Sequence, residues 1–205
     1  MNGLALLVTG GARSGKSSFA EQLASRLGER GIYIATSQIW DDEMRQRIAR
    51  HKQDRDSVAF EWRTIEEPLR LAEQLNELSR QLADEGRDVR PPVVLVDCLT
   101  LWLTNWLMHS ELADEEDAQL PLEQQRLAEE AEKLADAISG YPHPLVLVTN
   151  EVGDGIVPEY PLGRVFRDEQ GRLNQRIAAV CERVFLVTAG IPIELKSRAF
   201  QWDEL

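Results

Sequence analysis

Eight consecutive residues near the start of the chain have the types and the spacing that phosphate binding requires. They fit the pattern G-x-x-x-x-G-K-[ST] in full and are Gly10, Gly11, Ala12, Arg13, Ser14, Gly15, Lys16 and Ser17. The glycines allow backbone N–H groups to curve around an anion, and the N-terminus of a following helix adds unpaired donors. Lys16 can place its ammonium group on the β- and γ-phosphates of a nucleotide, and Ser17 can offer its hydroxyl group to Mg²⁺. We therefore predict that this segment binds a nucleoside triphosphate.

Asp97 has a carboxylate that could help to hold the metal ion. It directly follows the apolar segment 93–96. In P-loop nucleotide-binding proteins, an acidic residue at this place contributes to the Mg²⁺ site. An Asp there can instead cap the helix that follows. Because the phosphate-binding segment lies in the same chain, we favour the metal site over the cap.

The candidate nucleophile is a histidine in a row of basic residues. Arg47, His51 and Arg55 are spaced four residues apart, so they share one face of a helix predicted from about residue 41 to 54, with Lys52 beside His51. Flanking cations disfavour the imidazolium form and keep the ring nucleophilic. The same cations can stabilise charge that develops on an attacked phosphate. His51 is therefore a candidate for a covalent phosphoramidate intermediate; the alternative is an exposed basic helix without chemistry.

Strand and helix patterns alternate along the chain. Short apolar runs indicate buried parallel strands at 4–8, 32–35, 93–96, 145–148 and 184–187, and a further short strand is predicted at 60–64. Helical spacing occupies 16–27, 69–82, 99–108, 122–138 and 173–180. This order predicts a single α/β domain over 1–205, with a mostly parallel sheet and helices on both faces. Ligands of such folds bind at the carboxyl ends of the strands, where Thr36, Ser37 and Gln38 follow the second strand.

Composition excludes several classes of protein. The 205-residue chain has a net charge of −12, which argues against binding to a nucleic-acid backbone. No run approaches the roughly 20 apolar residues that span a bilayer, so we expect a cytoplasmic protein. Cys98 and Cys181 are the only cysteines, and neither has a CxxC partner. We expect two buried thiols and no zinc or redox site built from them.

Segments spread over most of the chain together resemble one family, the bifunctional adenosylcobinamide kinase / adenosylcobinamide-phosphate guanylyltransferases of cobalamin biosynthesis. These segments are 8–17, 33–38, 41–44, 47–48, 51–52, 62–64, 66, 104–105, 148–153, 155–159, 166–168 and 171–176. The phosphate-binding pattern alone would not single out this family, but the combination does.

The resemblance implies two consecutive reactions. The first is phosphorylation of the aminopropanol hydroxyl of adenosylcobinamide by a nucleoside triphosphate. Whether the enzyme prefers ATP or GTP as the phosphoryl donor stays open. The second is transfer of GMP from GTP through a covalent intermediate on His51, which gives adenosylcobinamide-GDP and pyrophosphate. It also implies a RecA-like P-loop NTPase fold, Mg²⁺ and a homotrimer. Beyond 10–17, the nucleotide contacts that it implies are Thr36, Ser37, Gln38, Lys52, Gln53, Asp54, Arg55, Glu66 and Asp97.

Two other functions stay open. One is a P-loop kinase of another small molecule, in which His51 is structural. The other is a nucleotide-dependent regulatory switch without transfer chemistry. A GTPase switch would normally carry N-K-x-D after a later strand, whereas here the strand at 145–148 leads to Asn150-Glu151-Val152-Gly153. The missing Lys and Asp weaken the switch hypothesis.

Overall fold

The computed structural model describes residues 3–38, 60–84, 90–109 and 120–201. Within these residues, seven strands form one sheet in the order β3-β2-β4-β5-β1-β6-β7. Strands β1 to β6 run parallel, and β7 pairs antiparallel with β6. The strands are β1 (Ala5–Thr9), β2 (Arg30–Ala35), β3 (Glu61–Glu66), β4 (Val93–Asp97), β5 (Leu145–Val148), β6 (Arg183–Thr188) and β7 (Ile191–Glu194). The predicted mostly parallel sheet is confirmed.

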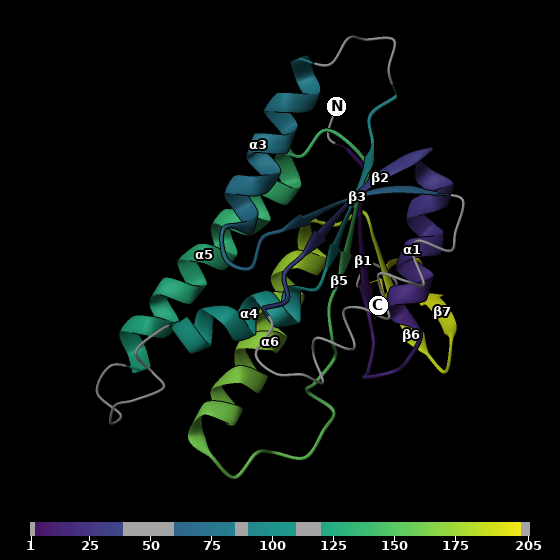
Figure 1. The fold of residues 1–205 in the computed structure, drawn as a ribbon. Coiled ribbons are helices and arrows are strands. Elements are labelled where there is room, and N and C mark those ends of the chain that lie inside the picture. The colour runs from purple at the N-terminus through teal and green to yellow at the C-terminus, as the bar shows by residue number, and fades with distance from the viewer. Residues whose placement is uncertain (1–2, 39–59, 85–89, 110–119, 202–205) are drawn as a thin grey trace.

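Helices cover both faces of this sheet, as predicted (Figure 1). Of the described helices, α1 lies on one face, and α3, α4, α5 and α6 form a layer on the other. Their bounds are α1 (Lys16–Leu27), α3 (Leu71–Asp84), α4 (Leu99–His109), α5 (Leu120–Gly140) and α6 (Pro161–Val180), followed by a 3₁₀ turn at Lys196–Arg198.

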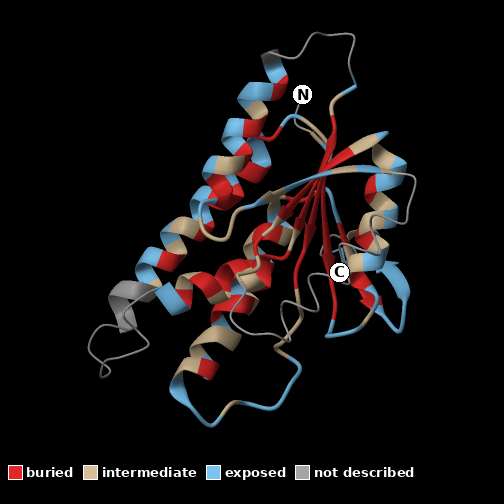
Figure 2. Ribbon diagram, viewed as in Figure 1, coloured by how far each residue is buried: buried red, intermediate tan, exposed pale blue. Residues whose placement is uncertain are grey.

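The central strands are buried on both faces, as Figure 2 shows by colour. Side chains alternate between two cores. Leu7 and Leu147 pack with the layer of four helices, whereas Val8 and Val148 pack with α1. Burial on both faces explains why these strands are continuous apolar runs without alternation of polar residues.

Two elements differ from the sequence prediction. Helix α6 begins at Pro161, well before the predicted start at 173, and β7 was not predicted at all. Proline suits the first turn of a helix because its fixed φ is already helical. Gly163 fits closely against Tyr160, since a Cβ there would lie 2.6 Å from a ring carbon of Tyr160. A glycine at that point is therefore a packing requirement and does not mark the end of the helix.

Cys98 and Cys181 are both free and buried, as predicted. The helix predicted over 41–54 lies outside the described residues. Among the helices that are described, each is too short or too polar to cross a membrane.

Asn105 on α4 ties the helical layer to two loops at the carboxyl edge of the sheet. Its side chain is buried, and its Nδ2 donates to the carbonyl oxygen of Thr36 at 2.7 Å and to that of Pro68 at 3.0 Å. These carbonyls belong to the segments that follow β2 and β3. One amide group therefore fixes the ends of two neighbouring strands.

Replacing Asn105 by Ala should lower the free energy of unfolding by about 2–4 kcal/mol, because two buried carbonyl groups lose their donor. Chemical denaturation of the purified protein measures this change. The matched control is Asn76→Ala on the exposed side of α3, which should change stability by less than roughly 0.5 kcal/mol. Equal stabilities of the two variants would contradict this role for Asn105.

Candidate nucleotide-binding site

The phosphate-binding segment forms the loop between β1 and α1, in the predicted place between a buried strand and a helix. Gly11, Ala12 and Arg13 are exposed, and Gly15 occupies the N-cap of α1 with φ +94°. No side chain caps this helix. The first N–H groups of α1 therefore have no capping side chain to bond, and such groups form a binding site for an anion.

Lys16 lies over this loop. Its side chain is 7% exposed, and its Nζ donates to the carbonyl oxygen of Gly11 at 3.2 Å. This bond carries the ammonium group back from the first turn of α1 to Gly11, near the start of the loop. A phosphate held by the loop would therefore meet a positive charge close to its backbone donors. Ser17, the next residue, is half-buried.

Glycine is sterically required at two positions of the loop. A Cβ on Gly10 would lie 2.4 Å from the carbonyl oxygen of Val187, and one on Gly15 would lie 3.2 Å from the Cα of Gly190. The N–H group of Gly190 donates to the carbonyl oxygen of Ser14 at 2.8 Å. The turn between β6 and β7 therefore supports the phosphate-binding loop from behind, a contact that the loop pattern itself does not predict.

Asp97 ends β4 on the same edge of the sheet. The register places it beside Val148 of β5, which in turn lies beside Val8 of β1. Two strand spacings, about 10 Å, therefore separate the backbone of Asp97 from that of β1. The carboxylate accepts a hydrogen bond from the Tyr33 hydroxyl group at 3.1 Å. None of its recorded bonds within the described residues goes to the N–H groups that open α4, so the capping alternative gains no support.

The loop after β2 is held against the end of β4 by Thr36. The Thr36 hydroxyl group donates to the carbonyl oxygen of Cys98 at 2.7 Å and accepts from the Cys98 N–H at 2.9 Å. Thr36 is fully buried, whereas Ser37 and Gln38 are partly exposed. Thr36 therefore fixes the loop, and Ser37 and Gln38 are the members of it that a ligand reaches more easily.

The remaining predicted contacts fall into two groups. Glu66 is exposed at the end of β3, beside Ala35 of β2, on the same carboxyl edge of the sheet. The other group lies within 39–59, outside the described residues, and consists of His51, Lys52, Gln53, Asp54 and Arg55. The roles of both groups stay predictions.

Cys98 lies directly after Asp97 but is not a nucleophile in the folded protein. Burial of its thiol is the main cause that raises the pKa to about 12, and the negative charge of Asp97 adds to it. At neutral pH the group is therefore protonated, whereas the reactive form of cysteine is the thiolate.

A buried polar cluster after β5 was not identified as part of the site from residue patterns. Thr149 donates to Asn174 Oδ1 at 2.7 Å, and Gln170 Nε2 donates to both Thr149 Oγ1 (3.1 Å) and Asn174 Oδ1 (2.9 Å). Asn174 Nδ2 donates in turn to the carbonyl oxygen of Asn150 at 2.9 Å. The N–H group of Glu151 donates to the carbonyl oxygen of Gly10 at 3.1 Å. The cluster thus joins α6 to the phosphate-binding loop.

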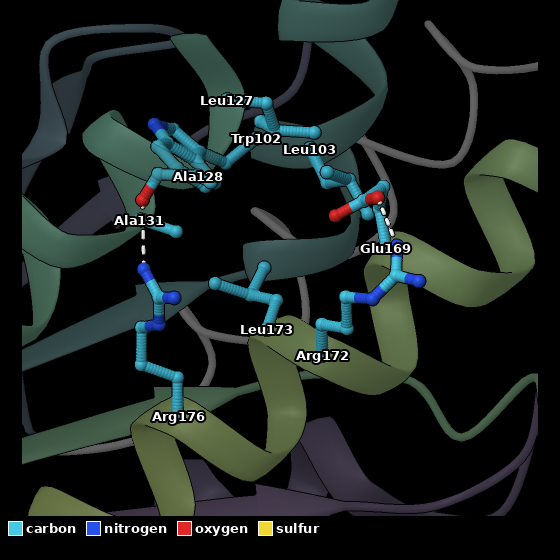
Figure 3. Close-up of a pocket in the computed structure, with 9 residues that line it drawn as sticks. All are labelled: Trp102, Leu103, Leu127, Ala128, Ala131, Glu169, Arg172, Leu173 and Arg176. Carbon is cyan, nitrogen blue, oxygen red and sulfur yellow. Dashed lines mark hydrogen bonds and ion pairs between the residues drawn. The ribbon is translucent and has the colours of Figure 1, made fainter. Parts of the chain in front are cut away.

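A small cavity lies between α4, α5 and α6 (Figure 3). Its volume is about 40 Å³, enough for very few water molecules. Arg172 pairs with Glu169 on one side of it, and Arg176 donates to the carbonyl oxygen of Ala128 on the other. The cavity is too small for a nucleotide or a corrinoid.

Comparison with known proteins supports the family that the sequence resembles. Residues 6–195 match the family described as cobinamide kinase / cobinamide phosphate guanyltransferase. The bifunctional adenosylcobalamin biosynthesis protein CobP of Pseudomonas aeruginosa is 46% identical over 190 residues, which cover 93% of this chain and 96% of that protein. The bifunctional adenosylcobalamin biosynthesis protein CobU of Escherichia coli is 42% identical over 193 residues, covering 93% of this chain and 99% of the relative.

A solved structure from Pyrococcus horikoshii OT3 is similar in fold alone. Its TM-score is 0.51 at 11% sequence identity, and the match covers 95% of this chain and 86% of that one. The fold assignment thus agrees with a distant structure, while the family rests on sequence. With its phosphate-binding loop in place and a family match that extends over most of its length, the chain belongs to the cobinamide kinase / cobinamide phosphate guanyltransferase family.

Proposed function

We propose that this protein is a bifunctional adenosylcobinamide kinase and adenosylcobinamide-phosphate guanylyltransferase of cobalamin biosynthesis. The observation that carries the proposal is the family match over 6–195, which includes a complete phosphate-binding loop at the carboxyl edge of the sheet. Corrinoid and nucleoside triphosphate are the substrates. A homotrimer and a cytoplasmic location stay predictions that rest on the resemblance.

In the kinase reaction, the backbone N–H groups of the loop and the Lys16 ammonium group bind the phosphates of ATP or GTP. The aminopropanol hydroxyl group of the corrinoid attacks the γ-phosphorus, and the nucleoside diphosphate leaves. The protein contributes position and positive charge, since phosphoryl transfer needs no protein nucleophile.

The residues present suit Mg²⁺. Ser17 offers a hydroxyl oxygen and Asp97 a carboxylate, both of them hard oxygen ligands. The described residues contain no group of three or more His, Cys, Asp or Glu side chains that could hold a metal ion. Nucleotide phosphates and water would therefore complete the coordination, which is usual for this ion. When bound, Mg²⁺ neutralises charge on the β- and γ-phosphates.

In the second reaction, we assign His51 as the nucleophile. Its neutral imidazole attacks the α-phosphorus of GTP, a P–N bond forms, and pyrophosphate leaves. A phosphate oxygen of adenosylcobinamide phosphate then attacks the same phosphorus, breaks the P–N bond and takes the GMP group. The basic neighbours Arg47, Lys52 and Arg55 support this assignment through their charge.

Incubation with α-labelled GTP distinguishes this function from its alternatives. A covalent guanylyltransferase keeps the label after denaturation, and the label leaves on addition of adenosylcobinamide phosphate. A kinase of another small molecule, or a regulatory nucleotide-binding protein, keeps no label. Absence of label on the wild-type protein would therefore remove the guanylyltransferase assignment.

Replacing Lys16 by Ala should abolish kinase activity and weaken nucleotide binding. Loss of a charge-assisted contact costs about 2–3 kcal/mol, or roughly 30- to 160-fold in affinity. Titration calorimetry with ATP and GTP measures the change. Lys133→Ala on α5 is the control, since this lysine is exposed and pairs with Glu130. Wild-type affinity in the Lys16 variant would show that the phosphates bind elsewhere.

Replacing Asp97 by Asn should lower Mg²⁺-dependent turnover by about 100-fold or more, because the metal supplies several kcal/mol of charge stabilisation. Stability should change little, since the amide oxygen can still accept the Tyr33 hydrogen bond. Turnover as a function of Mg²⁺ concentration is the measurement, with Asp136→Asn on the exposed side of α5 as control. A destabilised variant with normal metal dependence would identify Asp97 as purely structural.

Replacing His51 by Ala should remove guanylyl transfer and leave measurable phosphorylation of adenosylcobinamide, because only the second reaction needs a protein nucleophile. The wild-type label should be labile in acid and stable in base, as a phosphoramidate is. Peptide mapping of the labelled protein locates it. His109→Ala, at the exposed end of α4, should keep the label. Label on another residue, or full labelling of the His51 variant, would overturn this mechanism.

A further inference from the structure

The backbone after β5 keeps strand geometry for two residues past Thr149. The N–H groups of Thr149 and Glu151 donate to the carbonyl oxygens of Val8 and Gly10, at 2.9 Å and 3.1 Å, on the β1 side. The N–H group of Asn150 points the other way and donates to the Thr100 hydroxyl group at 2.8 Å. Alternate N–H groups on opposite sides are the pattern of an extended strand. Asn150 is therefore held in a strand-like conformation.

This geometry determines which face of the sheet the Asn150 side chain extends from. Leu147 packs with the layer of four helices and Val148 with α1. The Thr149 side chain bonds to Asn174 and Gln170 of α6, on the side of the four helices. Successive side chains alternate between faces, so that of Asn150 extends on the face of α1, which begins at the phosphate-binding loop.

The position across the sheet is equally defined. Val148 lies between Val8 of β1 and Asp97 of β4 in the strand register. Gly10, the first residue of the phosphate-binding loop, directly follows β1 along the chain. Asn150 follows β5, and β5 lies between β1, which leads into this loop, and β4, which ends at Asp97. If a nucleotide binds with its phosphates in this loop and its metal ion at Asp97, we expect its terminal phosphate to lie between the two, close to Asn150.

Buried bonds fix the Asn150 backbone, but its side chain has no partner among the described residues. The N–H group is bonded to Thr100 and the carbonyl oxygen to Asn174. Asn150 is half-buried as a residue, and no bond of its carboxamide to a described residue is recorded. Glu151 differs, because its carboxylate accepts the N–H of Gly153 at 3.1 Å. A rigid backbone that presents an unpaired donor is the arrangement of a preorganised ligand-binding group.

We propose that the Asn150 carboxamide donates a hydrogen bond to the terminal phosphate of the bound nucleoside triphosphate and is a catalytic residue of the kinase reaction. This inference rests on the proposed nucleotide binding at 10–17. A neutral donor at this place distinguishes a triphosphate from a diphosphate without adding charge next to Asp97.

The same bond acts in the transfer itself. The acceptor hydroxyl oxygen forms a bond to the γ-phosphorus, and the bond from this phosphorus to the bridging oxygen breaks. The diphosphate takes the electron pair, and the hydroxyl proton passes to water. Asn150 stabilises the equatorial oxygens of the phosphoryl group as their charge is redistributed.

The test compares triphosphate and diphosphate affinities by titration calorimetry on the full chain. The probes are a non-hydrolysable ATP analogue compared with ADP, and a non-hydrolysable GTP analogue compared with GDP. Asn150→Ala should weaken triphosphate analogue binding by about tenfold and leave diphosphate binding unchanged. Asn150→Asp, which matches the shape but brings negative charge, should weaken the triphosphate further. Asn76→Ala on exposed α3 should match the wild type.

Kinase assays complete the experiment. Asn150→Ala should lower kcat by about 100-fold, with a smaller change in KM for the corrinoid. An unchanged ratio of triphosphate to diphosphate affinity in both Asn150 variants would overturn the inference. If the wild type binds no nucleotide, the inference fails together with the proposed function. If it binds nucleotides but does not phosphorylate adenosylcobinamide, the proposed function fails alone, and the affinity ratio still decides the role of Asn150.

Discussion

The register of three parallel strands is the constraint on which the site depends. Val8, Val148 and Asp97 form one row across β1, β5 and β4. Hydrogen bonds of the sheet fix this row, and burial on both faces prevents a shift, since a slip of one residue would exchange the faces of every side chain. The phosphate-binding loop, Asn150 and the Asp97 carboxylate therefore keep fixed positions relative to one another. The chemistry that we propose for these groups depends on that spacing more than on any single contact.

Beyond the strand ends, side chains from helices take over the hydrogen bonds that a sheet ladder would make. Asn105 of α4 binds the carbonyl group of Thr36, and Asn174 of α6 binds that of Asn150. Thr100 accepts the N–H of Asn150. Buried backbone groups need such partners, so these polar side chains allow irregular loops to remain ordered at the sheet edge. The layer of four helices thus holds the site as well as the core.

The sheet and the phosphate-binding loop could be predicted from the sequence. Continuous apolar runs identified β1, β2, β4 and β5, because burial on both faces leaves no polar position in the middle of such strands. The run at 184–187 identified β6 as well, although this strand is only partly buried. The start of α6 was wrong, since Gly163 and Gly171 weaken its helical pattern while tertiary packing stabilises it. Exposed β7, with Pro192 within it, lacks the pattern of a buried strand. The cluster of Thr149, Gln170 and Asn174 could not be derived from residue patterns, because buried polar residues look like surface residues until their partners are known.

The central proposal is that a nucleoside triphosphate binds across the carboxyl ends of β1, β5 and β4. A crystal structure of the protein with Mg²⁺ and a non-hydrolysable triphosphate tests this claim most directly. We expect the β- and γ-phosphates within the loop 10–17 and within hydrogen-bond distance of Lys16 Nζ. We expect the metal ion between Ser17 and the Asp97 carboxylate, directly or through one water molecule. Phosphates bound away from this loop, or a metal ion on the opposite side of the γ-phosphate from Asp97, would contradict the account.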